Sequence, residues 1–166
     1  MTPFANVFTI THASPLGPVL LAASDQGLAG LWFEGQKHWP AGAAQWPAEP
    51  GHPLLREAAR QLDAYFSGKL LAFDLPLQLQ GATPFQHSVW NALREIPRGA
   101  TESYGALAHR IGRGAAVRAV GAAVGRNPVS IVVPCHRVLG QGGALTGYAG
   151  GLARKTALLR LEGALP

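Results

Sequence analysis

The chain of 166 residues contains a single cysteine, Cys135, and this scarcity limits what the protein can be. One cysteine cannot form a disulfide within the chain or supply the cysteine clusters of structural zinc sites. No apolar run reaches the roughly 18 residues that suggest a transmembrane helix, and no charged segment followed by an apolar stretch marks a secretory signal. We therefore expect a soluble, cytoplasmic protein.

Charged side chains are also scarce, at 14% of residues, but their signs are unevenly distributed. Residues 1–81 carry four basic and six acidic side chains, whereas residues 82–166 carry ten basic and three acidic ones. Nine of those ten basic residues are arginine, whose forked guanidinium suits phosphate contacts. The second half, with a net charge of +7, predicts a polyanionic partner such as nucleic acid; the alternative is a basic surface that contacts only solvent.

The first half has the pattern of an α+β domain with a three-stranded sheet and one helix. Alternating or continuous short apolar segments predict the strands, and residues at helical spacing that end at Gly68 predict the helix. A long aperiodic loop, pinned by Trp39 and Trp46, is expected between them. The expected elements are strands at Val7–Thr11, Pro18–Ser24 and Gly27–Phe33, a tight turn at Asp25–Gly27, the loop at 34–51, a helix at Leu54–Phe66 and a short strand near Phe73–Leu79.

The break Gln80-Gly81-Ala82 predicts two domains, residues 1–80 and residues 81–166. The second domain is expected to be helical, because Thr83-Pro84-Phe85-Gln86 has the sequence of a capped helix start. Two further short helices, Ser103–Ile111 and Ala115–Val124, flank a Gly-Arg-Gly turn and predict a helix-turn-helix.

The second of these helices is unusually smooth. It holds mostly alanine and glycine, and Arg118 is its one long side chain. Major-groove readers need polar side chains directed at base edges, so this helix favours close approach to a narrow groove with little sequence preference. The alternative is that the small residues allow close packing against another helix.

Cys135 lies in the string Ile131-Val132-Val133-Pro134-Cys135-His136-Arg137-Val138. Thiolate is the reactive form of cysteine, and an adjacent base or positive charge promotes it. The neighbouring imidazole and guanidinium therefore indicate a nucleophile. The alternative is a buried cysteine that acts as a small hydrophobic side chain.

These motifs resemble those of the O6-alkylguanine-DNA alkyltransferases. The resemblance rests on Pro134–Val138 together with Arg118–Gly121, Asn127-Pro128, Gly147–Gly151 and Lys155, in that family's order over residues 83–162. The strand-rich first half is also similar to the family's N-terminal domain. The resemblance implies a DNA repair protein that moves an alkyl group from guanine O6 to its own cysteine once per molecule, without a metal or other cofactor. Its partner would be double-stranded DNA carrying O6-alkylguanine, with O4-alkylthymine as a second possible substrate.

The resemblance also implies roles for the site residues. His136 would take the thiol proton through a water, and Glu162 would orient the imidazole, which is the logic of a catalytic triad. Tyr104 would assist the departing guanine, and Asn127 would brace the turn. The implied DNA contacts are Arg118 (filling the space of a flipped nucleotide), Tyr104, Ala119, Gly121, Arg126 and Arg137. The implied substrate pocket is Val124, Ser130, Val138, Tyr148, Ala149 and Lys155.

The sequence departs from the family's pattern at two positions of the expected pocket. Ser130 stands where some relatives have proline, and Ala149 where some have serine.

A protein that binds alkylated DNA without chemistry is one alternative function, which Cys135 argues against. A cysteine hydrolase is another, although adjacent cysteine and histidine rarely form such a dyad. A monomer is expected, with cooperative assembly on DNA as an open alternative.

Overall fold

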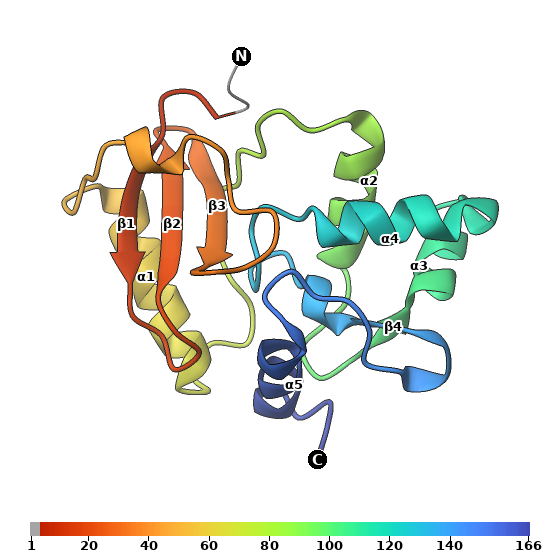
Figure 1. Cartoon of the computed structure of the whole chain (residues 1–166). Coiled ribbons are helices and arrows are strands. Elements are labelled where there is room, and N and C mark those ends of the chain that lie inside the picture. Colours follow the sequence, from red (N-terminus) through yellow and green to blue (C-terminus); the bar gives the residue numbers. More distant parts are fainter. Residues whose placement is uncertain (1–3) are drawn as a thin grey trace. The chain divides into compact units, whose positions relative to one another are not determined.

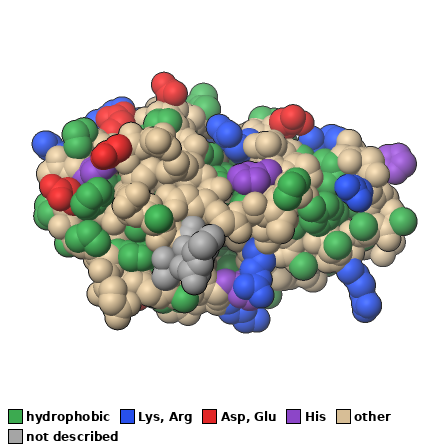
Figure 2. All heavy atoms as spheres, turned by 90° about the horizontal axis from the view of Figure 1, so that it is seen from above, with side chains coloured by type: hydrophobic (Ala, Val, Ile, Leu, Met, Phe, Trp, Pro, Cys, Tyr) green, Lys and Arg blue, Asp and Glu red, His purple; other side chains and the backbone are tan. Residues whose placement is uncertain are grey.

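The computed structural model describes residues 4–166, and the chain divides into two compact units. The first unit ends at Gly81 and the second begins at Ala82. On the face shown in Figure 2, acidic side chains gather on the first unit, and several lysine and arginine side chains project from the second. No helix in residues 4–166 is long and apolar enough to cross a membrane.

The first unit is built on an antiparallel sheet of three strands in the order β1-β2-β3 (Figure 1). Ser24 pairs with Gly27, so the turn between β2 and β3 contains only Asp25 and Gln26. β3 is buried at every position, and the amphipathic helix α1 packs against the sheet through Leu55, Leu62 and Tyr65. The bounds are β1 Phe8–His12, β2 Val19–Ser24, β3 Gly27–Phe33 and α1 Pro53–Phe66.

Two expectations for the first unit are wrong. The strand predicted near Phe73–Leu79 is reduced to one bridge between Leu77 and Leu28, because Pro76 has no N–H to continue the ladder. Trp39 is 43% exposed and does not pin the loop. Trp46 does, since its ring centroid lies 5.9 Å from that of Trp32, next to the short 3₁₀ helix η1 (Ala43–Gln45).

The second unit is mainly helical, as predicted. Helix α2 starts with the expected capping box, in which the Gln86 N–H donates to Thr83 Oγ1 and the Thr83 N–H donates to Gln86 Oε1. The indole N–H of Trp90 donates to the carbonyl of Ala123 and ties α2 to α4. The main elements are α2 Pro84–Leu93, β4 Glu102–Ser103, α3 Tyr104–Arg110, α4 Val117–Gly125, β5 Val138–Leu139 and α5 Leu152–Leu161 (Figure 1).

Helices α3 and α4 form the helix-turn-helix, with Gly112 at φ 76° in the turn. This left-handed conformation favours glycine. The predicted helix from Ala115 starts later than expected, because Gly114–Ala116 forms a separate 3₁₀ turn, η2. Two further 3₁₀ turns, η3 at Cys135–Arg137 and η4 at Gln141–Gly143, flank β5, which pairs in parallel with β4.

Candidate active site

Cys135 is the first residue of η3, at the end of a buried turn that Asn127 holds. The Asn127 amide donates to the carbonyl of Val133 at 2.7 Å, and its oxygen accepts from the N–H of Val129 at 2.9 Å. Within the turn, Ile131 has φ 72°, which is a strained conformation for a β-branched residue. Asn127 therefore closes the turn with two buried hydrogen bonds and stabilises the strained backbone that leads to the thiol.

The Cys135 side chain is buried, at 5% exposure. Burial raises the pKa of the thiol, whereas a hydrogen bond from Asn127 and the positive charge of Lys155 act to lower this pKa. Activation of this thiol therefore depends on groups inside the protein, and a base must take its proton.

His136 and Glu162 form a hydrogen-bonded pair that solvent does not reach. The distance between Nε2 and Oε2 is 2.8 Å, and both side chains have 0% exposure. Burial lowers the pKa of His136, so the imidazole is neutral at pH 7. A carboxylate only accepts hydrogen bonds, so Nε2 carries the proton. Nδ1 has no hydrogen-bond partner among the described residues, which leaves its lone pair able to accept a proton.

Arg137 points inward and contacts the same carboxylate. Its Nε and Nη2 each lie 2.9 Å from an oxygen of Glu162, and Nη1 donates to the carbonyl of Ile96 at 2.6 Å. The DNA contact expected of Arg137 stays a prediction, and in this structure its side chain is only 10% exposed and its donors bind protein acceptors.

Lys155 is fully buried and joins α5 to two other backbone segments. Its ammonium group donates to the carbonyls of Val138, Thr146 and Gly147 at 2.6, 2.9 and 3.1 Å. Burial lowers the pKa of Lys155 to about 8, against an opposing effect of Cys135. Lys155 thus braces the end of the Gly140–Gly147 loop, and its place in the substrate pocket stays a prediction.

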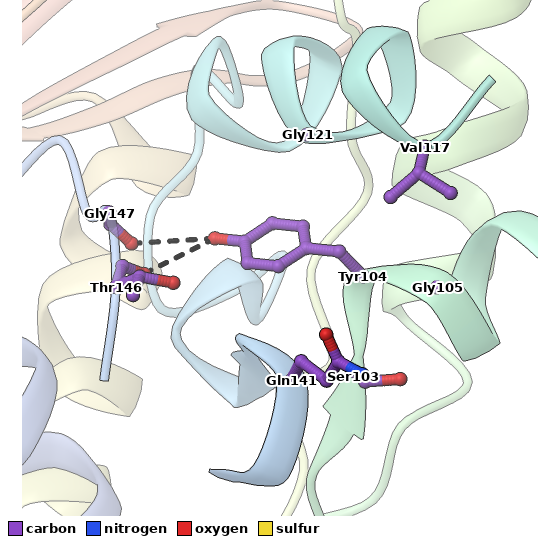
Figure 3. Close-up of a pocket in the computed structure, with 8 residues that line it drawn as sticks. All are labelled: Ser103, Tyr104, Gly105, Val117, Gly121, Gln141, Thr146 and Gly147. Atoms are coloured by element: carbon purple, nitrogen blue, oxygen red, sulfur yellow. Dashed lines mark hydrogen bonds between the residues drawn. The ribbon is translucent and has the colours of Figure 1, made fainter. Parts of the chain in front are cut away.

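A pocket of about 760 Å³ lies beside Tyr104. Figure 3 shows the Tyr104 ring running beneath Gly121 of α4, with its hydroxyl directed at the backbone of Thr146 and Gly147. The hydroxyl donates weakly to these two carbonyls at 3.4 and 3.5 Å. Burial raises the pKa of Tyr104, so the phenol keeps its proton and can serve as a donor. The pocket is lined by Ser103, Tyr104, Gly105, Val117, Gly121, Gln141, Thr146 and Gly147.

None of the residues expected in the substrate pocket lines the cavity beside Tyr104, and their role stays a prediction. Val124, Ser130 and Val138 are buried and do not line this pocket, while Tyr148 and Ala149 are half-buried. Sequence reasoning missed Gln141 and Thr146, which do line it. The signal was the glycine-rich stretch Gly140–Gly147, because such a segment commonly forms a loop near a ligand.

The exposed face of α4 matches the expected smooth surface. Arg118, Ala119 and Arg126 are exposed, whereas Val120 and Ala123 are buried on the opposite face. Helix α4 also contacts α2 and α3, so close packing accounts for the small residues on its other side. Gly121 is half-buried, and a Cβ added there would lie 3.7 Å from the Tyr104 ring.

The protonation state of Lys155 is expected to make the reaction rate of Cys135 depend on pH. Lys155 is charged below about pH 8 and neutral above it, so its support of the Cys135 thiolate and of the loop weakens as the pH rises. We expect the rate at which a small alkylating agent modifies Cys135 to fall above about pH 8. Intact mass measured against time over pH 6–10 checks this. A rate that keeps rising to pH 10 would contradict this expectation. The Lys155→Met variant is expected to react slowly at every pH and to show no decrease in rate above pH 8.

No group of three or more histidine, cysteine, aspartate or glutamate side chains that could hold a metal ion occurs within residues 4–166. The site contains instead one thiol, one neutral imidazole, one carboxylate and two buried cations. These groups suit a reaction in which the thiol acts as the nucleophile and the imidazole takes its proton.

Comparison with known proteins gives consistent matches to both units. The model of the ribonuclease-like domain of 6-O-methylguanine DNA methyltransferase matches residues 7–79, and the model of the DNA binding domain of the same protein matches residues 84–164. The methylated-DNA–protein-cysteine methyltransferase of Methanosarcina acetivorans is 51% identical over 150 residues, covering 90% of this chain and 94% of that protein. The protein of the same name from Mycobacterium tuberculosis is 50% identical over 152 residues, covering 92% and 90%.

Solved structures agree with these sequence matches. The crystal structure of Mycobacterium tuberculosis O6-methylguanine methyltransferase superposes with a TM-score of 0.86 at 47% identity, covering 95% of this chain and 93% of that one. The Mycobacterium tuberculosis OGT structure in complex with DNA has a TM-score of 0.85 at 47% identity, covering 96% and 94%. With both halves matched and half of the residues identical to such relatives, the chain belongs to the 6-O-methylguanine DNA methyltransferase family.

Proposed function

We propose that this protein repairs DNA by moving an alkyl group from O6 of guanine, or O4 of thymine, to Cys135, once per molecule. The observation that carries the proposal is the chain's only thiol beside a buried His136–Glu162 pair, inside the region that matches a DNA binding domain. Residues 1–80 would form a structural domain, and residues 81–166 the DNA-binding and alkyl-acceptor domain.

The chemistry balances with the groups of this chain. Cys135 Sγ forms a bond to the alkyl carbon while the bond from that carbon to O6 breaks, and its electron pair stays on guanine. The thiol proton passes to His136 Nδ1, through a water, and from there to the departing base. Tyr104, which keeps its phenolic proton, donates to the leaving guanine and reduces its developing charge. The thioether that forms has no easy route back, so each molecule reacts once.

Access to O6 requires the nucleotide to leave the base stack. The smooth, exposed face of α4 suits entry into the minor groove, with Arg118 filling the vacated space and Ala119 and Arg126 beside the backbone. Val124, Ser130, Tyr148 and Ala149 would surround the alkyl group. We propose a cytoplasmic monomer, because the chemistry needs a reduced thiol and access to DNA.

The direct test is the intact mass of the protein after incubation with duplex DNA carrying one O6-methylguanine. The expected result is a gain of about 14 Da, the mass of one CH₂, mapped to Cys135 and saturating at one equivalent per molecule. Binding without a mass gain would favour the alternative of a protein that only recognises alkylated DNA. Turnover beyond one equivalent would exclude a single-use acceptor.

Arg118→Ala tests the proposed flipping step. We expect about 100-fold slower repair in duplex DNA, because unstacking costs a few kcal/mol and Arg118 would offset part of this cost. Reaction with the free O6-methylguanine base should change by less than about threefold, since no base has to be unstacked there. Both rates are measured by intact mass, with Arg94→Ala as the exposed-arginine control on the same unit. Equal losses on duplex and free base would count against the flipping role.

A further inference from the structure

We propose that Arg137 is a positioning residue that fixes Glu162 as an oriented anion and thereby keeps His136 available as a base. This inference rests on the proposed function, since it assigns Arg137 a role in the same proton transfer. It replaces the DNA contact expected from the sequence with an internal one.

Arg137 and His136 together hold the Glu162 carboxylate in one orientation. Both oxygens of Glu162 accept from Arg137, and Oε2 also accepts from His136. A planar guanidinium that binds a carboxylate through two parallel hydrogen bonds fixes its plane as well as its position. Nη1 anchors the guanidinium to Ile96, in the turn that follows α2. Glu162 therefore cannot rotate away from the imidazole without breaking two charged hydrogen bonds.

The position of Glu162 in the fold makes its negative charge unfavourable. Glu162 is the C-cap of α5, where the negative end of the helix dipole disfavours an anion, and its side chain is fully buried. Both effects oppose ionisation of this carboxyl group. A cation in direct contact with both oxygens compensates for them. Arg137 meets this requirement, whereas lysine would supply the charge without the fork.

Several charged groups surround the imidazole of His136. Glu162 faces it from α5 and raises the pKa of His136, while Arg137 and Lys155 lower it. Arg98 also lies at this end of α5, where it donates to the carbonyl of Leu161. An ionised, immobile Glu162 accepts the Nε2 proton and leaves Nδ1 to receive the thiol proton. Without Arg137, the buried His136–Glu162 pair would take up a proton at higher pH and hold it.

The experiment measures Cys135 alkylation by the free O6-methylguanine base over pH 5–8, by intact mass, so that DNA affinity does not enter. Arg137→Gln is expected to lower the rate by about 10- to 100-fold, as seen for residues that orient a reactive ligand at metal sites. The acid-side midpoint of the rate should move up by about one pH unit, because a buried neighbouring cation has been removed. Arg137→Lys should restore the midpoint but only part of the rate. The control Arg160→Gln removes a cation at the exposed last turn of the same helix and should change neither.

Several outcomes would overturn the proposal. A normal rate and midpoint on free base, combined with weak repair of duplex DNA, would show that Arg137 contacts DNA instead. A lower yield with an unchanged midpoint would show a purely structural role. If Arg137→Gln does not fold, Arg137→Lys decides: a rate equal to that of the unmodified protein would refute positioning by the fork. Failure of the unmodified protein to gain mass on Cys135 refutes the proposed function, which distinguishes the two cases.

Discussion

Glu162→Gln is expected to slow alkylation of Cys135 by about 10⁴-fold, in line with the loss of the orienting carboxylate in other triads. The amide no longer requires the proton to stay on Nε2 of His136, so the tautomer with a free Nδ1 lone pair loses its support. The amide also cannot stabilise the imidazolium that forms when the thiol proton moves. The rate is measured by intact mass with methylated duplex and with free base, and both should fall together.

Glu95→Gln is the matched control for this change. Glu95 belongs to the same unit, pairs with Arg110, and is 72% exposed, so its loss should alter the rate by less than about twofold. Glu162→Gln also leaves Arg137 buried without its anion, which should cost about 3–5 kcal/mol of stability. The rates are therefore compared at a temperature where calorimetry shows both proteins folded. A Glu162→Gln protein that reacts within threefold of the unmodified one would contradict the triad.

Asn127→Ala is expected to lower the free energy of unfolding by about 2–4 kcal/mol, because it leaves two buried backbone groups without their partners. These groups are the N–H of Val129 and the carbonyl of Val133, on either side of the strained Ile131. The change also removes a hydrogen bond that lowers the pKa of Cys135, so the thiol should react more slowly in the molecules that remain folded. Urea unfolding followed by circular dichroism measures the first effect, and the alkylation rate measures the second.

The control for this experiment is Asn91→Ala on α2, where the asparagine is exposed. Such a surface change should stay within about 0.5 kcal/mol. Equal stability of the Asn127 and Asn91 variants would show that the turn before Cys135 does not depend on the asparagine clamp.

Local sequence signals predicted the elements that depend on neighbouring residues. The capping box of Thr83 and Gln86 marks the start of α2, and the three apolar runs of the first half mark β1, β2 and β3. Each of these signals acts within a few residues, where backbone hydrogen bonding and side-chain spacing decide the conformation. The predicted strand near Phe73–Leu79 was wrong because an apolar run with Pro76 at its centre offers no continuous ladder.

By itself, the sequence determined that one thiol stands beside an imidazole in the basic half of an α+β chain, and its motifs were sufficient to identify the family. The family resemblance implied the pairing of His136 with Glu162, but only the tertiary structure decided the partners of the buried cations. It brought Glu162 to His136 across 26 residues and turned Arg137 and Lys155 inward. The physical reason is burial: a charge removed from water must find opposite charge or carbonyl oxygens, and packing between distant segments determines which of them it finds.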